Sequence, residues 1–168
     1  MSVLSAGTLP GFETAEKIAR FIELPRGWHY GRGVPPSRDI ARDALRILFR
    51  ASLLGFKETD AFAGADGEIH VTAYHGPFYL EFTVDPDEGV RFVREDGDEE
   101  TARIPNLSLA QALSILDDTW ADVCRSLGLS TAATTTRESG GFKISLSSIP
   151  KMVQASLPSN MIVEYEPA

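Results

Sequence analysis

The sequence predicts an α+β fold, in which an antiparallel β-meander packs against amphipathic helices. Two segments, residues 38–54 and 109–127, carry apolar side chains at helical spacing. Between them, residues 69–92 alternate apolar and polar side chains and are interrupted by turn residues such as Gly76 and Pro77. Strands that are joined by such short turns run antiparallel, and a sheet with one apolar face needs helices to cover it.

The first predicted element is a short helix that begins at Thr14 and ends before Pro25. Its apolar residues recur on one face. Residues 25–36 then form a loop, because three glycines and three prolines exclude a regular element. We expect the loop's two large aromatic residues, Trp28 and Tyr30, to anchor it against the next helix.

The second predicted helix covers residues 38–54, with Ser37 as its N-cap and Gly55 at its end. Its apolar side chains cover an arc of about 260° when residues are placed 100° apart. A helix with so wide an apolar surface must be covered on more than one side.

Arginines recur every four residues along this helix, at Arg38, Arg42, Arg46 and Arg50. Such a stripe can follow the phosphates of a nucleic acid or bind an acidic protein. However, Asp39 and Asp43 are interleaved with the arginines. We therefore favour ion pairs within the chain and solvation, and we rank an acidic protein partner second and nucleic acid last.

The alternation predicts strands over residues 69–74, 78–85 and 90–92, with residues 101–104 as a candidate fourth strand. Ser108 and Gln111 then form a capping box ahead of the helix over residues 109–127. The apolar arc of that helix is only about 120° wide, so it should lie on a surface of the sheet. Cys124 falls on its apolar face and is expected to be a small buried hydrophobe.

The rest of the chain differs in composition. A Thr/Ala-rich segment leads to a predicted strand around Phe142, a helical turn over residues 150–157 and a last strand over residues 161–166. We interpret residues 1–128 as an α+β core domain. Residues 129–168 would be a C-terminal β-β-α-β extension that completes this domain or acts as a partner-binding arm.

Charge is distributed unevenly along the 168 residues, whose formal net charge is −8. Residues 1–57 contain nine Lys and Arg against five Asp and Glu, whereas residues 58–100 contain two against thirteen. The overall acidity argues against a general nucleic-acid coat and against an anionic membrane surface. The lack of an apolar segment of spanning length and the single cysteine favour a soluble protein in the cytoplasm.

The histidines offer little for catalysis or metal binding. His29, His70 and His75 lack the spacing of a helical metal pair, and five residues along a strand place His70 and His75 on opposite faces. The glycines of residues 27–33 also lack the Lys-Ser/Thr ending of a phosphate loop. We expect no cofactor, no metal and no catalysis, and we keep an enzyme that uses His70, His75 and nearby carboxylates such as Glu68 as an alternative.

Acidic residues gather in residues 95–100 and in the turn over residues 85–88. One interpretation is a solvated turn that also blunts an edge of the sheet. The other is a single negative surface that steers a basic partner protein onto the domain. Aromatic side chains and the C-terminal arm would supply the buried contacts. The candidate partner-binding residues are Tyr74, Tyr79, Glu95, Asp98, Glu99, Met152 and Leu157.

Residues 24–100 contain LPRGWHYGRGVPPS, an amphipathic helix and DGEIHVTAYHGPFYLEFTVDPDEGVRF. This segment resembles a group of short bacterial proteins with a Gly-Trp loop, spaced glycines and an Asp-Gly-x-Ile meander. The resemblance implies an accessory or antitoxin-type product and transfers no activity and no functional residue. The order of elements is also similar to that of type III secretion chaperones, apart from the extra strand at Met161.

These observations lead to one expected function and its alternatives. We expect a non-catalytic bacterial module of the antitoxin, inhibitor or immunity type, which masks or scaffolds a partner protein. A secretion-chaperone-like adaptor, or an accessory subunit of a larger bacterial assembly, is the alternative without catalysis.

Overall fold

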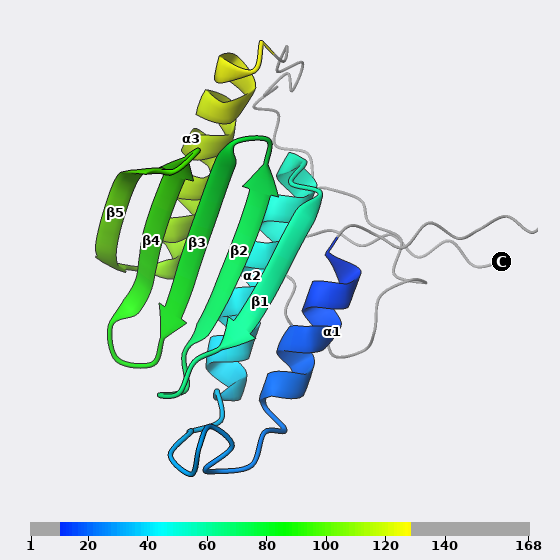
Figure 1. Ribbon diagram of the computed structural model, residues 1–168, viewed down its shortest axis with the longest axis vertical. Helices are drawn as coiled ribbons and strands as arrows, with labels where there is room; N and C mark the ends of the chain where they lie inside the picture. Colours follow the sequence, from blue (N-terminus) through cyan, green and yellow to red (C-terminus); the bar gives the residue numbers. More distant parts are fainter. Residues whose placement is uncertain (1–10, 129–168) are drawn as a thin grey trace, which may run out of the picture. The chain divides into compact units, whose positions relative to one another are not determined.

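The computed structural model describes residues 11–128, and these residues form an α+β fold as the sequence predicts (Figure 1). The elements follow one another as α1 (Phe12–Phe21), α2 (Arg38–Leu54), β1 (Glu58–Ala63), β2 (Ile69–His75), β3 (Phe78–Asp85), β4 (Gly89–Asp96), β5 (Glu99–Leu107) and α3 (Leu109–Ser126). The predicted C-terminal extension, with Met152 and Leu157, lies outside the described residues.

The five strands form one antiparallel meander in the order β1-β2-β3-β4-β5. The predicted meander is thus confirmed, and its candidate fourth strand is part of β5. β1 was not predicted. The side chains that β1 turns toward the helices are small, such as Ala61. Its one large apolar side chain, Phe62, points to the other face of the sheet and is 49% exposed.

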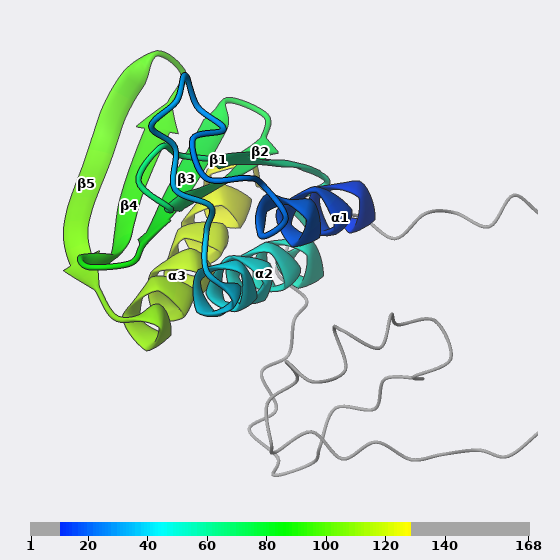
Figure 2. The same ribbon diagram turned by 90° about the horizontal axis from the view of Figure 1, so that it is seen from below.

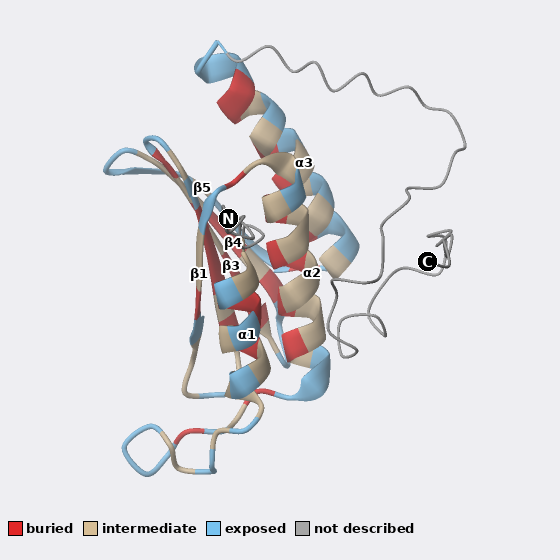
Figure 3. Cartoon of the chain, turned by 90° about the vertical axis from the view of Figure 1, so that its right-hand side faces the viewer, coloured by how far each residue is buried: buried red, intermediate tan, exposed pale blue. Residues whose placement is uncertain are grey.

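The three helices lie on one face of this sheet (Figures 2 and 3). α2 packs against β2 and β3, α3 against β4 and β5, and α1 against β1, while α1 and α3 both contact α2. α2 is therefore covered by the sheet and by a helix on each side. This arrangement confirms the expectation that its wide apolar arc requires cover on more than one side.

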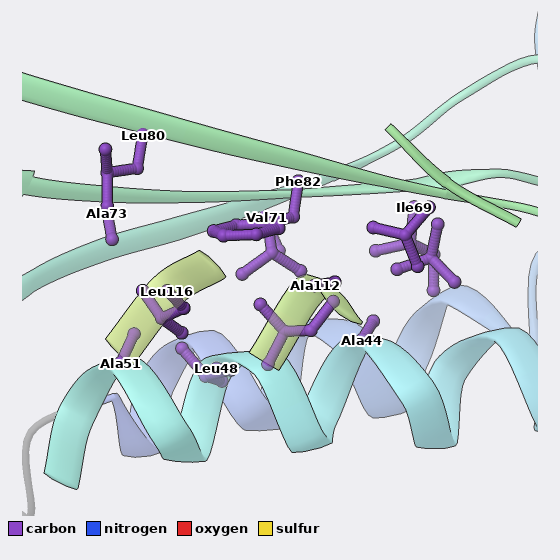
Figure 4. Close-up of a cluster of buried hydrophobic side chains, with 14 of the residues drawn as sticks. Ala44, Leu48, Ala51, Ile69, Val71, Ala73, Leu80, Phe82, Ala112 and Leu116 are labelled. Carbon is purple, nitrogen blue, oxygen red and sulfur yellow. The ribbon is translucent and has the colours of Figure 1, made fainter. Parts of the chain in front are cut away.

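The core lies between the helices and the covered face of the sheet (Figure 4). Leu48 of α2 and Leu116 of α3 are fully buried against it, and Phe82 of β3 stacks on Phe92 of β4 with ring centroids 4.9 Å apart. Burial of such side chains is the main source of the fold's stability.

Side-chain caps begin the two long helices, as predicted. Ser37 Oγ accepts a hydrogen bond from the Ile40 N–H at 3.3 Å. Ser108 and Gln111 form the reciprocal capping box, because each side chain accepts a hydrogen bond from the other residue's backbone N–H. Cys124 is buried in α3, as expected.

Two predictions near the N-terminus are wrong. Thr14 is not an N-cap: α1 begins after Gly11, and the buried Thr14 hydroxyl donates to the Thr59 carbonyl oxygen at 2.9 Å. Tyr30 does not anchor its loop, because it is 95% exposed. The loop instead closes on itself, and Trp28 Nε1 donates to the Val34 carbonyl oxygen at 3.4 Å.

Candidate functional site

The candidate site is the open face of the sheet, which no helix within residues 11–128 covers (Figure 3). Side chains alternate between the two faces of a strand, and the strand register groups those of the open face into three cross-strand rows. The tyrosine row consists of Glu58, Tyr74, Tyr79, Glu95 and Glu100. The central row consists of Asp60, Thr72, Glu81, Val93 and Arg103. The histidine row consists of Phe62, His70, Thr83 and Arg91.

A hydrogen-bond network centred on Glu81 joins these rows. The Tyr79 hydroxyl donates to Glu81 Oε2 at 2.6 Å, and His70 Nδ1 lies 3.1 Å from Oε1. Thr83 Oγ1 donates to Oε1 at 3.3 Å and is also 3.2 Å from His70 Nδ1. Because Thr83 is only 1% exposed, the side chains around it form a closed surface.

The network shifts the titration of its members. The hydrogen bond to His70 lowers the pKa of Glu81 to about 2, outweighing the effect of burial, and the Tyr79 hydroxyl contributes in the same direction. The same bond to Glu81 raises the pKa of His70 against the effect of burial. Burial, and then the bond to Glu81, raise the pKa of Tyr79. The network therefore holds an ionised Glu81 beside a His70 that keeps its proton more readily than usual.

The His70–Glu81 pair should make stability depend on pH. Below the unfolded-state pKa of Glu81, 4.5, the unfolded chain takes up a proton that the folded chain does not bind, so stability falls as the pH approaches 2. Above the unfolded-state pKa of His70, 6.5, only the folded chain keeps the His70 proton, so stability falls again as the pH rises through the raised folded pKa. The contribution of the pair is greatest between these two values, and we expect about 1 kcal/mol there.

Urea unfolding at a series of pH values measures this contribution. His70→Ala should flatten the dependence above neutral pH, while the exposed loop histidine serves as the matched control, so that His29→Ala keeps the wild-type profile. A His70→Ala profile that runs parallel to the wild type at every pH would contradict the assignment.

The predicted partner-binding residues divide into three sets. Tyr74, Tyr79 and Glu95 come together in the tyrosine row, where the two tyrosine ring centroids are 5.1 Å apart. Asp98 lies in the turn between β4 and β5, and Glu99 begins β5, where it pairs with Asp96, next to the Glu95–Glu100 pair and on the opposite face of the sheet. The remaining two, Met152 and Leu157, lie outside the described residues.

The two acidic turns do not form one continuous surface. β3 and β4 are paired from Asp85 with Gly89 to Phe78 with Asp96. At about 3.4 Å per residue, this ladder separates the two acidic turns by more than 20 Å. The 85–88 turn therefore lies at one end of the sheet and residues 95–100 lie at the other.

His70 and His75 lie on opposite faces of β2, as predicted. His75 is on the covered face, where its ring centroid is 5.1 Å from that of Trp120. The structure therefore does not bring the two histidines together. Within residues 11–128, no group of three His, Cys, Asp or Glu side chains is arranged to hold a metal ion.

Ion pairs within the chain occupy most of the arginine stripe of α2, as favoured from the sequence. Arg42 binds Asp39 at 2.6 Å, and Arg46 is 3.6 Å from Asp43. Arg50 donates twice to Asp117 of α3, at 2.6 and 2.8 Å, which raises the pKa of Arg50. The last pair holds two helices together.

The sequence did not single out Glu81 or Phe62 as candidate functional residues, although the alternation places Glu81 on the polar face with Tyr79. A signal for Glu81 was present, since a two-residue turn at Gly76-Pro77 pairs His75 with Phe78. Moving away from the turn by one residue on each strand gives the next pair, and the third step pairs Thr72 with Glu81. Phe62 belongs to β1, which had no recognisable strand pattern.

Comparisons with protein-family models, with curated proteins and with solved structures found no match. Among the described helices, none combines the length and the apolar character that crossing a membrane requires.

Proposed function

We propose that this chain is a non-catalytic protein-binding module that masks or scaffolds a partner protein through the open face of its sheet. One observation carries the proposal. Exposed aromatic side chains, Phe62 at 49% and Tyr74 at 39%, stand on paired strands of an uncovered sheet face. Protein interfaces are enriched in aromatic residues and arginine, and such residues supply much of the binding free energy.

The order of the face supports this function. The network around Glu81 fixes Tyr79 beside Tyr74 and His70 beside Phe62. A surface whose side chains are already held in place loses little conformational entropy when a partner binds.

The surroundings of His70 favour binding over catalysis. Its Nδ1 is 3.1 Å from Glu81, and its Nε2 is 3.8 Å from Glu68. Carboxylates beside both ring nitrogens stabilise the protonated imidazole, whereas a general base must offer a free lone pair. We therefore infer stoichiometric binding of the antitoxin, inhibitor or immunity type, in the bacterial cytoplasm.

The proposal is tested by quantitative capture from a bacterial extract with three full-length baits. These are the wild type, the face variant Phe62→Ala/Tyr74→Ala, and a control variant, Tyr30→Ala/Leu53→Ala, which removes a tyrosine and an apolar side chain that are exposed elsewhere. We expect at least one protein that the wild type and the control retain equally and that the face variant retains about tenfold less.

Light scattering then measures the stoichiometry of the purified complex. A monomer that forms a 1:1 complex is the expected result. Equal recovery of every protein by the three baits would contradict the role of the face. A stable homodimer that binds no partner would favour the adaptor alternative.

A further inference from the structure

The rows of the open face differ in how their charges are neutralised. In the central row, Lys17 of α1 reaches around β1 and binds Asp60 at 2.7 Å. In the same row, Glu81 has His70 as its partner. In the tyrosine row, by contrast, no cation of residues 11–128 lies within 4.0 Å of Glu58 or Glu95.

Two other places in the molecule show what occupies a site built from an aromatic ring and a carboxylate. The Lys17 ammonium lies 4.5 Å from the centre of the Phe62 ring while it binds Asp60. On the covered face, the Arg94 guanidinium lies 5.4 Å from the centre of the Phe78 ring, and it donates to Asp96 at 2.9 and 3.1 Å. In both places the occupant is a cation of this chain.

Around Tyr74 and Tyr79 the tyrosine row has the same components, but the cation that the structure describes beside this row, Arg103 of the central row, binds Glu100 and not Glu58 or Glu95. Tyr74 and Tyr79 are neighbours in the row, and Glu58 and Glu95 flank them on β1 and β4. Besides burial and the bond to Glu81, the charge of Glu95 raises the pKa of Tyr79, which indicates a negative potential at its hydroxyl.

We propose that the tyrosine row binds an arginine side chain of the partner protein, with the guanidinium against the tyrosine rings and in hydrogen-bonding reach of Glu58 or Glu95. This inference rests on the proposed function, because it names the chemistry of the partner at the same face. Arginine suits the site better than lysine, since its planar guanidinium stacks on aromatic rings and donates two parallel hydrogen bonds.

Charge complementarity also favours a basic partner over a second copy of this chain. The tyrosine row contains three glutamates, Glu58, Glu95 and Glu100, and no basic residue, and only Glu100 has a cation partner among the described residues, so two copies of the row repel each other. Asp98 and Glu99 lie next to Glu100 along the chain and add long-range attraction for a basic segment.

The inference is tested by titrating the full-length protein with short blocked peptides and following its amide resonances. The probes are a peptide of alternating arginine and serine and two matched peptides, with lysine or with the uncharged isostere citrulline in place of arginine. We expect the arginine peptide to shift resonances of the tyrosine row and to bind about tenfold more tightly than the citrulline peptide. The lysine peptide should bind with intermediate affinity.

Variants locate the binding. Tyr74→Ala should weaken binding of the arginine peptide about five- to tenfold, and Glu95→Gln a few-fold. The controls are Tyr30→Ala in the exposed loop and Glu88→Gln in the acidic turn at the other end of the sheet, and both should bind as the wild type does.

Equal binding of the arginine and citrulline peptides, unchanged binding by Tyr74→Ala, or no binding at low ionic strength would each overturn the inference. A homodimer that dissociates on Tyr74→Ala would also overturn it, because a second copy would then occupy the row. Capture by the Phe62→Ala/Tyr74→Ala bait still decides the proposed function separately.

Discussion

The Phe82→Ala variant is expected to unfold with a free energy about 4 kcal/mol below that of the wild type. Phe82 is 1% exposed and lies at the centre of the covered face, where its ring stacks on that of Phe92. Removal of the ring leaves a cavity between the sheet and the helices. Backbone hydrogen bonds keep the sheet and each helix in shape, so neither can move easily to fill the cavity. Such a site collapses poorly, so the variant loses both the transfer free energy and the surrounding packing contacts. Urea unfolding measures the loss.

A second strand phenylalanine provides the matched control. Phe62 lies on the open face of β1 and is 49% exposed, so Phe62→Ala should cost no more than about 1 kcal/mol. Both variants replace a phenylalanine with alanine, so the difference between their free energies of unfolding compares the covered face with the open one. Similar losses in both would mean that the two faces are not as different as the structure indicates.

The long helices were predictable because their signals are local. The Ser37 cap, the Gly55 end and the apolar periodicity between them all lie within α2 itself. The same holds for α3, in which Ser108 and Gln111 form both halves of the capping box. A sequence window contains all that is needed to place such elements.

Elements that depend on distant partners were not predictable in the same way. β1 turns a threonine and two alanines toward the helices, and its place in the sheet depends on α1, where Thr14 binds Thr59 across the chain. A threonine at the start of a helix serves equally well as a cap or as a buried hydroxyl. Which role it takes is decided by a contact 45 residues away.

Some residues of the candidate site were predictable, but their arrangement was not. Tyr74, Tyr79 and Glu95 were each singled out, yet only the strand register places them in one row. The same register makes His70 and Glu81 diagonal neighbours on β2 and β3, and their hydrogen bond lowers the pKa of Glu81 and raises that of His70. For the acidic residues the sequence showed two turns of similar composition, but it gave no information about the distance between these turns.

β5 lies close to the first residue of β4, and a substitution there should have the second of the two largest effects. Gly89→Ala is expected to lower the free energy of unfolding by about 3 kcal/mol. Gly89 has a φ of +77°, and a Cβ added to it would lie 2.7 Å from the Leu107 carbonyl oxygen. The added methyl group therefore meets a backbone atom of β5 that can move only if the strand pairing next to it, Val90 with Leu107, is disturbed.

The matched control is Gly97, in the turn between β4 and β5. It has a φ of +68°, and nothing lies within 4 Å of its added Cβ. Gly97→Ala therefore carries only the conformational cost, about 1 kcal/mol, and the difference between the two variants measures the close approach of β5. Because β5 supplies Arg103 and Glu100 to the open face, Gly89→Ala should also shift their amide resonances, whereas equal losses in the two variants would show that β5 does not approach Gly89 closely.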